Sequence, residues 1–192
     1  QYLMGTPAIG NLDEDDDLEV VIGGYSSPTS SNQIFAINFD GSDVDGFPII
    51  LGEKIKSGVA LADFNGNGKD DIIAGTDNDN IYLIFDDGTI APGFPYITGD
   101  KMQAAPSVAE IGGDKVIFAG SNDNTFYVIN SDGSLRFTVE TGDKVQSSPS
   151  FLQQVSIPPG LEPKFGSVSP KQPILVPAPK PGSHLAFCSS EP

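Results

Sequence analysis

The strongest constraint on the fold is a ten-residue pattern that recurs along the chain. It occurs as LGEKIKSGVA, TGDKMQAAPS and TGDKVQSSPS, at residues 51–60, 98–107 and 141–150, and MGTPA at residues 4–8 is a partial copy. Repeats therefore begin near residues 3, 55, 102 and 145. Recurrence at this spacing is typical of proteins that stack one supersecondary unit against the next.

Within each repeat, short apolar segments and turn residues follow the same order. A short segment leads through a polar loop to an apolar run that ends in Gly, as in LEVVIGG, DIIAG and KVIFAG. An alternating segment follows and stops at an Asp-Gly pair, as in NQIFAINFDG, NIYLIFDDG and NTFYVINSDG, and GFPII, GFPYI or LRFTVE ends the unit. Alternating β-branched and aromatic residues predict strands, and Asp-Gly pairs favour tight turns.

Four short strands per repeat predict an all-β fold. They are typical of a β-propeller blade, whose faces are buried only when blades stack. We therefore expect a β-propeller fragment of about three four-stranded blades plus the start of a fourth, with almost no helix. Buried strands are expected at residues 20–22, 34–37, 72–73, 81–85, 116–118 and 126–129.

The sequence divides into two parts. Residues 1–154 hold the predicted blades, and because this part opens and breaks off inside repeats, we expect it to belong to a longer array. Completion of the ring by a second copy is the alternative. Residues 155–192 are rich in Pro and show no repeat, so we expect an irregular tail that packs little, either a linker or a sequence artefact.

Residues 63–71, DFNGNGKDD, form the clearest candidate metal loop. Side-chain oxygens of Asp63, Asn65, Asn67 and Asp71 fall at loop positions 1, 3, 5 and 9, and the main-chain carbonyl of Lys69 falls at position 7. Calcium prefers six to eight hard oxygen ligands. The glycines between these residues allow the loop to curl tightly. An ordinary Asn/Gly turn is the alternative interpretation.

Residues 11–19 repeat this pattern less closely. Asn11, Asp13, Asp15 and Glu19 supply the side-chain oxygens, and Asp17 supplies the carbonyl. An EF-hand is excluded in both loops, because position 12 would need a bidentate Glu and is occupied by Ile22 and Ala74. In the third repeat the corresponding loop, residues 110–114, is too short to surround a metal.

These motifs resemble known families. DFNGNGKDDI resembles the FG-GAP (VCBS) repeats of integrin-like propellers, and the third unit is similar to blades of quinoprotein-like (PQQ-type) propellers. The resemblance covers about residues 3 to 153 and implies a propeller whose loops bind calcium. It implies little about activity, because propellers have many functions.

Charge and missing motifs narrow the possible functions. The net charge is -16, which disfavours nucleic acid and anionic lipid surfaces. No apolar run is long enough for membrane insertion. The single His184 lies in the tail, the chain has no Trp, and we assign no catalytic residues.

We therefore expect a non-enzymatic, calcium-binding propeller region that is extracellular, at the cell surface or periplasmic. Its expected role is adhesion or interaction, through a protein or glycan ligand. Two alternatives remain at this stage: an accessory part of a secreted hydrolase or lyase, and an assembly scaffold without metal.

Overall fold

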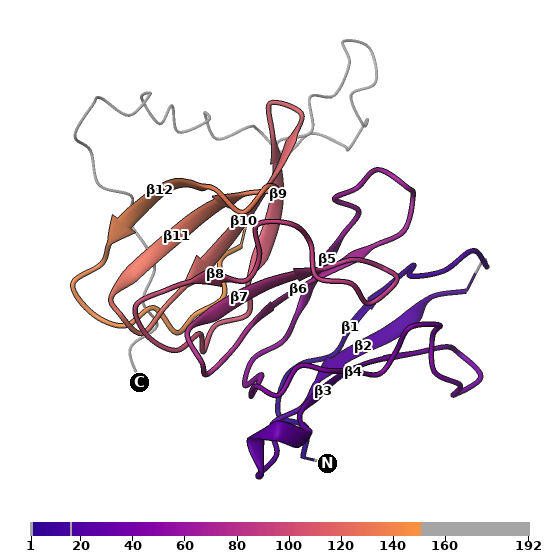
Figure 1. The fold of residues 1–192 in the computed structure, drawn as a ribbon. Helices are drawn as coiled ribbons and strands as arrows, with labels where there is room; N and C mark the ends of the chain where they lie inside the picture. Colours follow the sequence, from indigo (N-terminus) through magenta and orange to yellow (C-terminus); the bar gives the residue numbers. More distant parts are fainter. Residues whose placement is uncertain (1, 16, 151–192) are drawn as a thin grey trace, which may run out of the picture. The chain divides into compact units, whose positions relative to one another are not determined.

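A computed structural model describes residues 2–15 and 17–150 of the 192-residue chain. They lie in one compact unit, Gln1–Leu152, which is built from three four-stranded antiparallel sheets (Figure 1). The predicted irregular tail lies outside the described residues. Within the described part, the only helical element is a 3-10 turn at Thr29–Ser31, and no helix there has the length and apolarity needed to cross a membrane.

Each sheet is a meander whose strands pair in chain order. Blade 1 contains β1 (Ala8–Gly10), β2 (Glu19–Gly23), β3 (Gln33–Ile37) and β4 (Ile49–Ile50). Blade 2 contains β5 (Ala60–Ala62), β6 (Asp71–Gly75), β7 (Asn80–Ile84) and β8 (Tyr96–Ile97). Blade 3 contains β9 (Ser107–Ile111), β10 (Asp114–Gly120), β11 (Thr125–Asn130) and β12 (Leu135–Glu140). The predicted all-β blades are thus confirmed.

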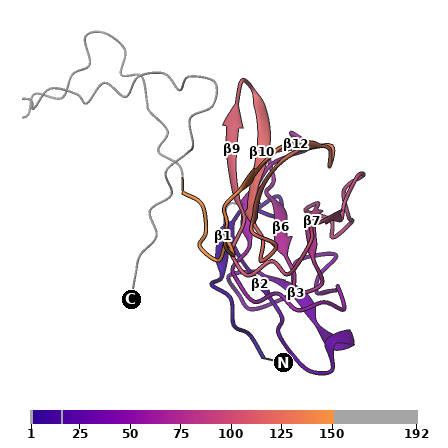
Figure 2. The same cartoon turned by 90° about the vertical axis from the view of Figure 1, so that its left-hand side faces the viewer.

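The hydrophobic core lies between the blades, which follow one another in Figure 1 and overlap in the turned view of Figure 2. One cluster joins Val21 and Ile34 of blade 1 to Ile72 and Ile84 of blade 2. A second cluster repeats this packing between blades 2 and 3, with Ile73, Ile81, Ile117 and Ile129 among its members. Adjacent residues of a strand point to opposite faces of the sheet, so blade 2 contributes to both clusters.

A glycine at the end of each second strand makes room for the next repeat. A Cβ added to Gly23 would lie 2.6 Å from the Cβ of Ile55, and one added to Gly75 would lie 2.7 Å from the Cβ of Met102. Val145 covers Gly120 in the same way. These three apolar residues are the repeat starts that the sequence indicated, and each occupies the space left by the absent glycine side chain.

Main-chain hydrogen bonds join the blades at the same points. The N–H groups of the three repeat starts donate to the preceding blade, from Ile55 to Gly24 (2.9 Å), from Met102 to Thr76 (2.9 Å) and from Val145 to Ser121 (3.0 Å). Each repeat start in the sequence is therefore also a point of contact between successive blades.

The predicted strands lie where the observed ones do, but some of their residues differ in position or burial. Several residues expected to be buried are half-buried: Ile22, Phe35, Ile37 and Tyr127. Phe85 follows β7 instead of ending it. Val20, expected to be buried, is 37% exposed, whereas Ile72, at the same position of blade 2, is fully buried. The reason is that Ile72 packs on blade 1, while no described blade precedes blade 1.

This difference gives a direct test of blade packing. Ile72→Ala should lower the free energy of unfolding by about 2 to 5 kcal/mol, because it removes buried methyl groups and leaves a cavity. Val20→Ala, the matched change on blade 1, should cost less than about 1 kcal/mol, because Val20 is already partly hydrated. Chemical denaturation measures both values, and equal costs would contradict the blade assignment.

Candidate metal centre

The two candidate loops occupy the same place in successive blades. Residues 11–18 connect β1 to β2, and residues 63–70 connect β5 to β6. In blade 3 the corresponding connection is a two-residue turn, Gly112 and Gly113, both with positive φ. The structure therefore agrees with the expectation that the third loop is too short to surround a metal.

The blade 1 loop is curled by its own acidic side chains. An Oδ1 of Asp13 accepts the N–H of Asp15 (2.9 Å), and an Oδ1 of Asp15 accepts the N–H of Asp17 (2.8 Å). Glu19, the first residue of β2, accepts the N–H of Leu12 (2.5 Å). One carboxylate oxygen from each of Asp13, Asp15 and Glu19 lies within 4.8 Å of the others.

Two buried oxygens in this loop have no hydrogen-bond partner among the described residues. They are Oε1 of Glu19, whose residue is only 1% exposed, and Oδ1 of Asn11. Burial raises the pKa of Glu19; the Leu12 N–H opposes this rise, and repulsion from Asp13 and Asp15 adds to it. Three mutually repelling carboxylates and an unpaired buried oxygen fit a hard divalent cation.

The blade 2 loop is also curled, but its oxygens are already used. The carboxylate of Asp63 accepts the N–H groups of Gly66 (2.6 Å) and Gly68 (3.0 Å). Both glycines have positive φ, 80° and 88°, which is the left-handed region that this curl requires. The side-chain oxygens of Asn65 and Asn67 accept the N–H groups two residues ahead, at 3.0 and 2.8 Å.

Asp71 lies at the base of this loop and is fully buried. Its carboxylate accepts the N–H groups of Phe64 (2.7 Å), Asn65 (3.3 Å) and Asp86 (3.1 Å). Burial is the largest influence and raises the pKa of Asp71 to about 6, although these donors oppose the rise. Asp71 therefore fixes both ends of the loop to the strand ends around it.

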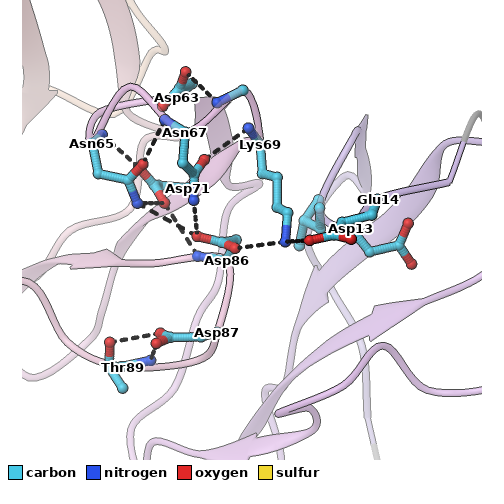
Figure 3. Close-up of polar contacts among 12 residues, drawn as sticks. Asp13, Glu14, Asp63, Asn65, Asn67, Lys69, Asp71, Asp86, Asp87 and Thr89 are labelled. Carbon is cyan, nitrogen blue, oxygen red and sulfur yellow. Dashed lines mark hydrogen bonds and ion pairs between the residues drawn. The ribbon is translucent and has the colours of Figure 1, made fainter.

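Asp86, which precedes the Asp-Gly turn after β7, is a further partner of the blade 2 loop. Its carboxylate accepts Nδ2 of Asn67 (2.9 Å) and lies 3.5 Å from Nζ of Lys69 (Figure 3). The same Nζ is 3.7 Å from Glu14 of blade 1. No local sequence signal links residues 67 and 86, because the connection depends on the pairing of β6 with β7. Asp87, in contrast, accepts hydrogen bonds from the N–H and hydroxyl groups of Thr89 within its own Asp-Gly turn, as expected.

The two loops thus differ in a way that their motifs did not indicate. The blade 2 loop matches the motif more closely, but its carboxylates are paired and Lys69 places an ammonium group beside it. The blade 1 loop matches less closely, yet it holds the unpaired buried oxygens. Burial and partners distinguish the loops, and neither can be deduced from ligand spacing.

Both loops border one cavity at the junction of blades 1 and 2. Its volume is about 580 Å³, and six of its lining residues are acidic: Asp13, Glu14, Asp15, Asp45, Asp86 and Asp87. Lys69 is the single basic residue of this lining. A cavity of this charge attracts cations.

Comparison with known proteins supports the fold. No protein-family model matches the sequence, and no curated protein sequence matches it significantly. Among solved structures, BamB from Moraxella catarrhalis is similar over 73% of this chain and 37% of its own, with 15% identity and a TM-score of 0.53. BBS1N, solved in complex with ARL6DN, is similar over 75% of this chain and 43% of its own, with 15% identity and a TM-score of 0.51.

These neighbours are propeller-like proteins, so the chain has a propeller-like fold. It spans less than half the length of either structure. At such identity the likeness concerns architecture alone, because one propeller scaffold carries many functions.

The buried Asp71 predicts how stability depends on pH in the presence of chelator. Its folded-state pKa of about 6 exceeds the ordinary value of 3.8 for an Asp side chain, so the folded state keeps the proton to a higher pH than the unfolded chain does. The Asp71 contribution to stability should therefore fall as pH rises from about 4 to 6. Asp71→Asn lacks this titration. Between pH 4 and 6, denaturation should therefore show that the free energy of unfolding of the variant rises relative to that of the parent. A constant difference would contradict the raised pKa.

Proposed function

We propose that this chain is a calcium-binding region of a β-propeller, which presents the rim around its loops to a protein or glycan ligand and does not catalyse a reaction. The observation that carries this proposal is the unpaired, buried Oε1 of Glu19 beside Asp13 and Asp15. A buried carboxylate oxygen without a partner is costly, and a divalent cation would remove that cost.

Calcium fits the donor set better than a transition metal. The described loops offer carboxylate, amide and carbonyl oxygens, and hard oxygen ligands favour calcium over metals that prefer nitrogen or sulfur. In blade 1 the ligands would be Asn11, Asp13, Asp15, Glu19 and the carbonyl of Asp17. In blade 2 they would be Asp63, Asn65, Asn67, Asp71 and the carbonyl of Lys69, with Lys69 reducing the affinity.

Bound calcium would stiffen the loops that border the acidic cavity. Open, partly exposed loops of this kind suit millimolar calcium, which is characteristic of extracellular fluid. We therefore place the protein at the cell surface, outside the cell or in the periplasm. Recognition of a protein or glycan by a rigid rim follows the general rule that loops on a stable scaffold carry function.

Calcium should stabilise the folded chain by mass action. When free calcium is tenfold above Kd, the gain is about 1.4 kcal/mol for one site, so calcium should raise the melting temperature and chelator should lower it. Asp13→Ala should remove more of this response than Asp63→Ala, and the double variant should remove it. Asp132→Ala is the control, because the Asp132 carboxylate lies in a turn of blade 3 and accepts hydrogen bonds from Ser134. Identical melting with calcium and chelator would refute metal binding.

The ligand-binding part of the proposal has its own test. The purified chain should bind members of a glycan array, or extracellular matrix proteins on a surface, in millimolar calcium. Binding should weaken in chelator and in the double variant. If calcium stabilises the chain but no ligand is retained in either condition, the role as an interaction module is wrong and calcium is purely structural.

A further inference from the structure

We propose that Asp70 of blade 2 is a positioning residue for the metal loop of blade 1. The inference rests on the proposed calcium site and adds that a residue outside that loop, on the neighbouring blade, determines its affinity. Asp70 is not among the ligands that the motif indicates, because it belongs to the connection of the other blade.

Asp70 binds both main-chain polar groups of Asn11, the first residue of the blade 1 loop. The N–H of Asp70 donates to the carbonyl of Asn11 at 2.6 Å. In return, the N–H of Asn11 donates to Oδ2 of Asp70 at 3.2 Å. Two reciprocal hydrogen bonds fix the position and direction of Asn11, where the loop leaves β1.

The space for this contact comes from Gly10. A Cβ added to Gly10 would lie 2.5 Å from Oδ2 of Asp70 and 2.7 Å from Cδ1 of Leu61. Any side chain at this position would push the carboxylate away from Asn11. The close approach of the two blades therefore depends on a glycine that belongs to neither predicted ligand set.

Asp70 is itself held by its neighbours in the chain. It precedes Asp71, the buried carboxylate at the base of the blade 2 loop, and it follows Lys69, which reaches Glu14 of blade 1 at 3.7 Å. Residues 69–71 thus contact both loops. Because these three residues are consecutive in the chain, a change in the position of one loop is transmitted directly to the other.

The next blade junction lacks this clamp. Lys115 of blade 3 is the equivalent of Asp70, since each has the same spacing from the glycine that ends the second strand, Gly120 or Gly75. There the first loop residue is Asp63 rather than Asn11. A lysine side chain is a donor only, so Lys115 has no oxygen that could accept the N–H of Asp63. The blade 2 loop therefore lacks the outer partner that Asp70 gives to the blade 1 loop.

The test measures calcium affinity by titration calorimetry in an Asp63→Ala background, which leaves the blade 1 loop as the binding site. Asp70→Ala should weaken calcium binding about tenfold or more, as loss of an outer partner of a metal ligand typically does. Asp70→Asn keeps an oxygen that can accept the N–H of Asn11, so its affinity should stay within about threefold of the background. Asp40→Ala, which removes an exposed turn carboxylate of blade 1, should change nothing.

The outcomes separate the two proposals. If the background protein binds no calcium, the proposed blade 1 site fails, and titration of the unsubstituted chain shows whether the blade 2 loop binds calcium instead. If the background protein binds calcium and Asp70→Ala binds it equally well, the positioning role is overturned. The role is also overturned if Asp70→Asn binds as weakly as Asp70→Ala, because the loss of charge alone would then explain the effect. Melting in chelator checks that each variant folds, and Asp70→Ser replaces Asp70→Ala if the latter does not.

Discussion

The structure depends on the packing of each blade against the next. Blade 2 is a sheet apolar on both faces, with Ile72 directed toward blade 1 and Ile73 toward blade 3. Such a sheet is stable only when both faces are covered. The glycine that ends each second strand permits this, since Gly23 and Gly75 admit the repeat starts Ile55 and Met102 at a distance where a side chain would clash.

The candidate site is a consequence of this stacking. Because successive blades have the same topology, their first connections lie at the same end of the sheets and face each other across a junction. The contact of Asp70 with Asn11 and that of Lys69 with Glu14 both cross this junction. The two candidate loops are therefore in contact across the junction, and the packing of the blades maintains their geometry.

Burial gives the acidic residues different roles. Exposed acids such as Asp87 and Asp132 accept hydrogen bonds within their own turns. Asp71 and Glu19 begin central strands, are removed from water, and have raised pKa values. Asp71 is compensated by three main-chain N–H groups, whereas one oxygen of Glu19 has no partner among the described residues. This difference makes blade 1 the stronger metal candidate.

The sequence by itself determined the strands, the blades and the two loops, because alternation, Asp-Gly turns and a ten-residue pattern that recurs once in each blade-length repeat are features that sheet geometry imposes. Only the tertiary structure decided which loop holds an unpaired oxygen, that Asp86 contacts the blade 2 loop and Asp70 the blade 1 loop, and that Val20 is exposed while Ile72 is buried. These properties depend on which blade lies next to which residue. Contacts between residues far apart in sequence set burial and partners, and ligand spacing within one loop carries no information about them.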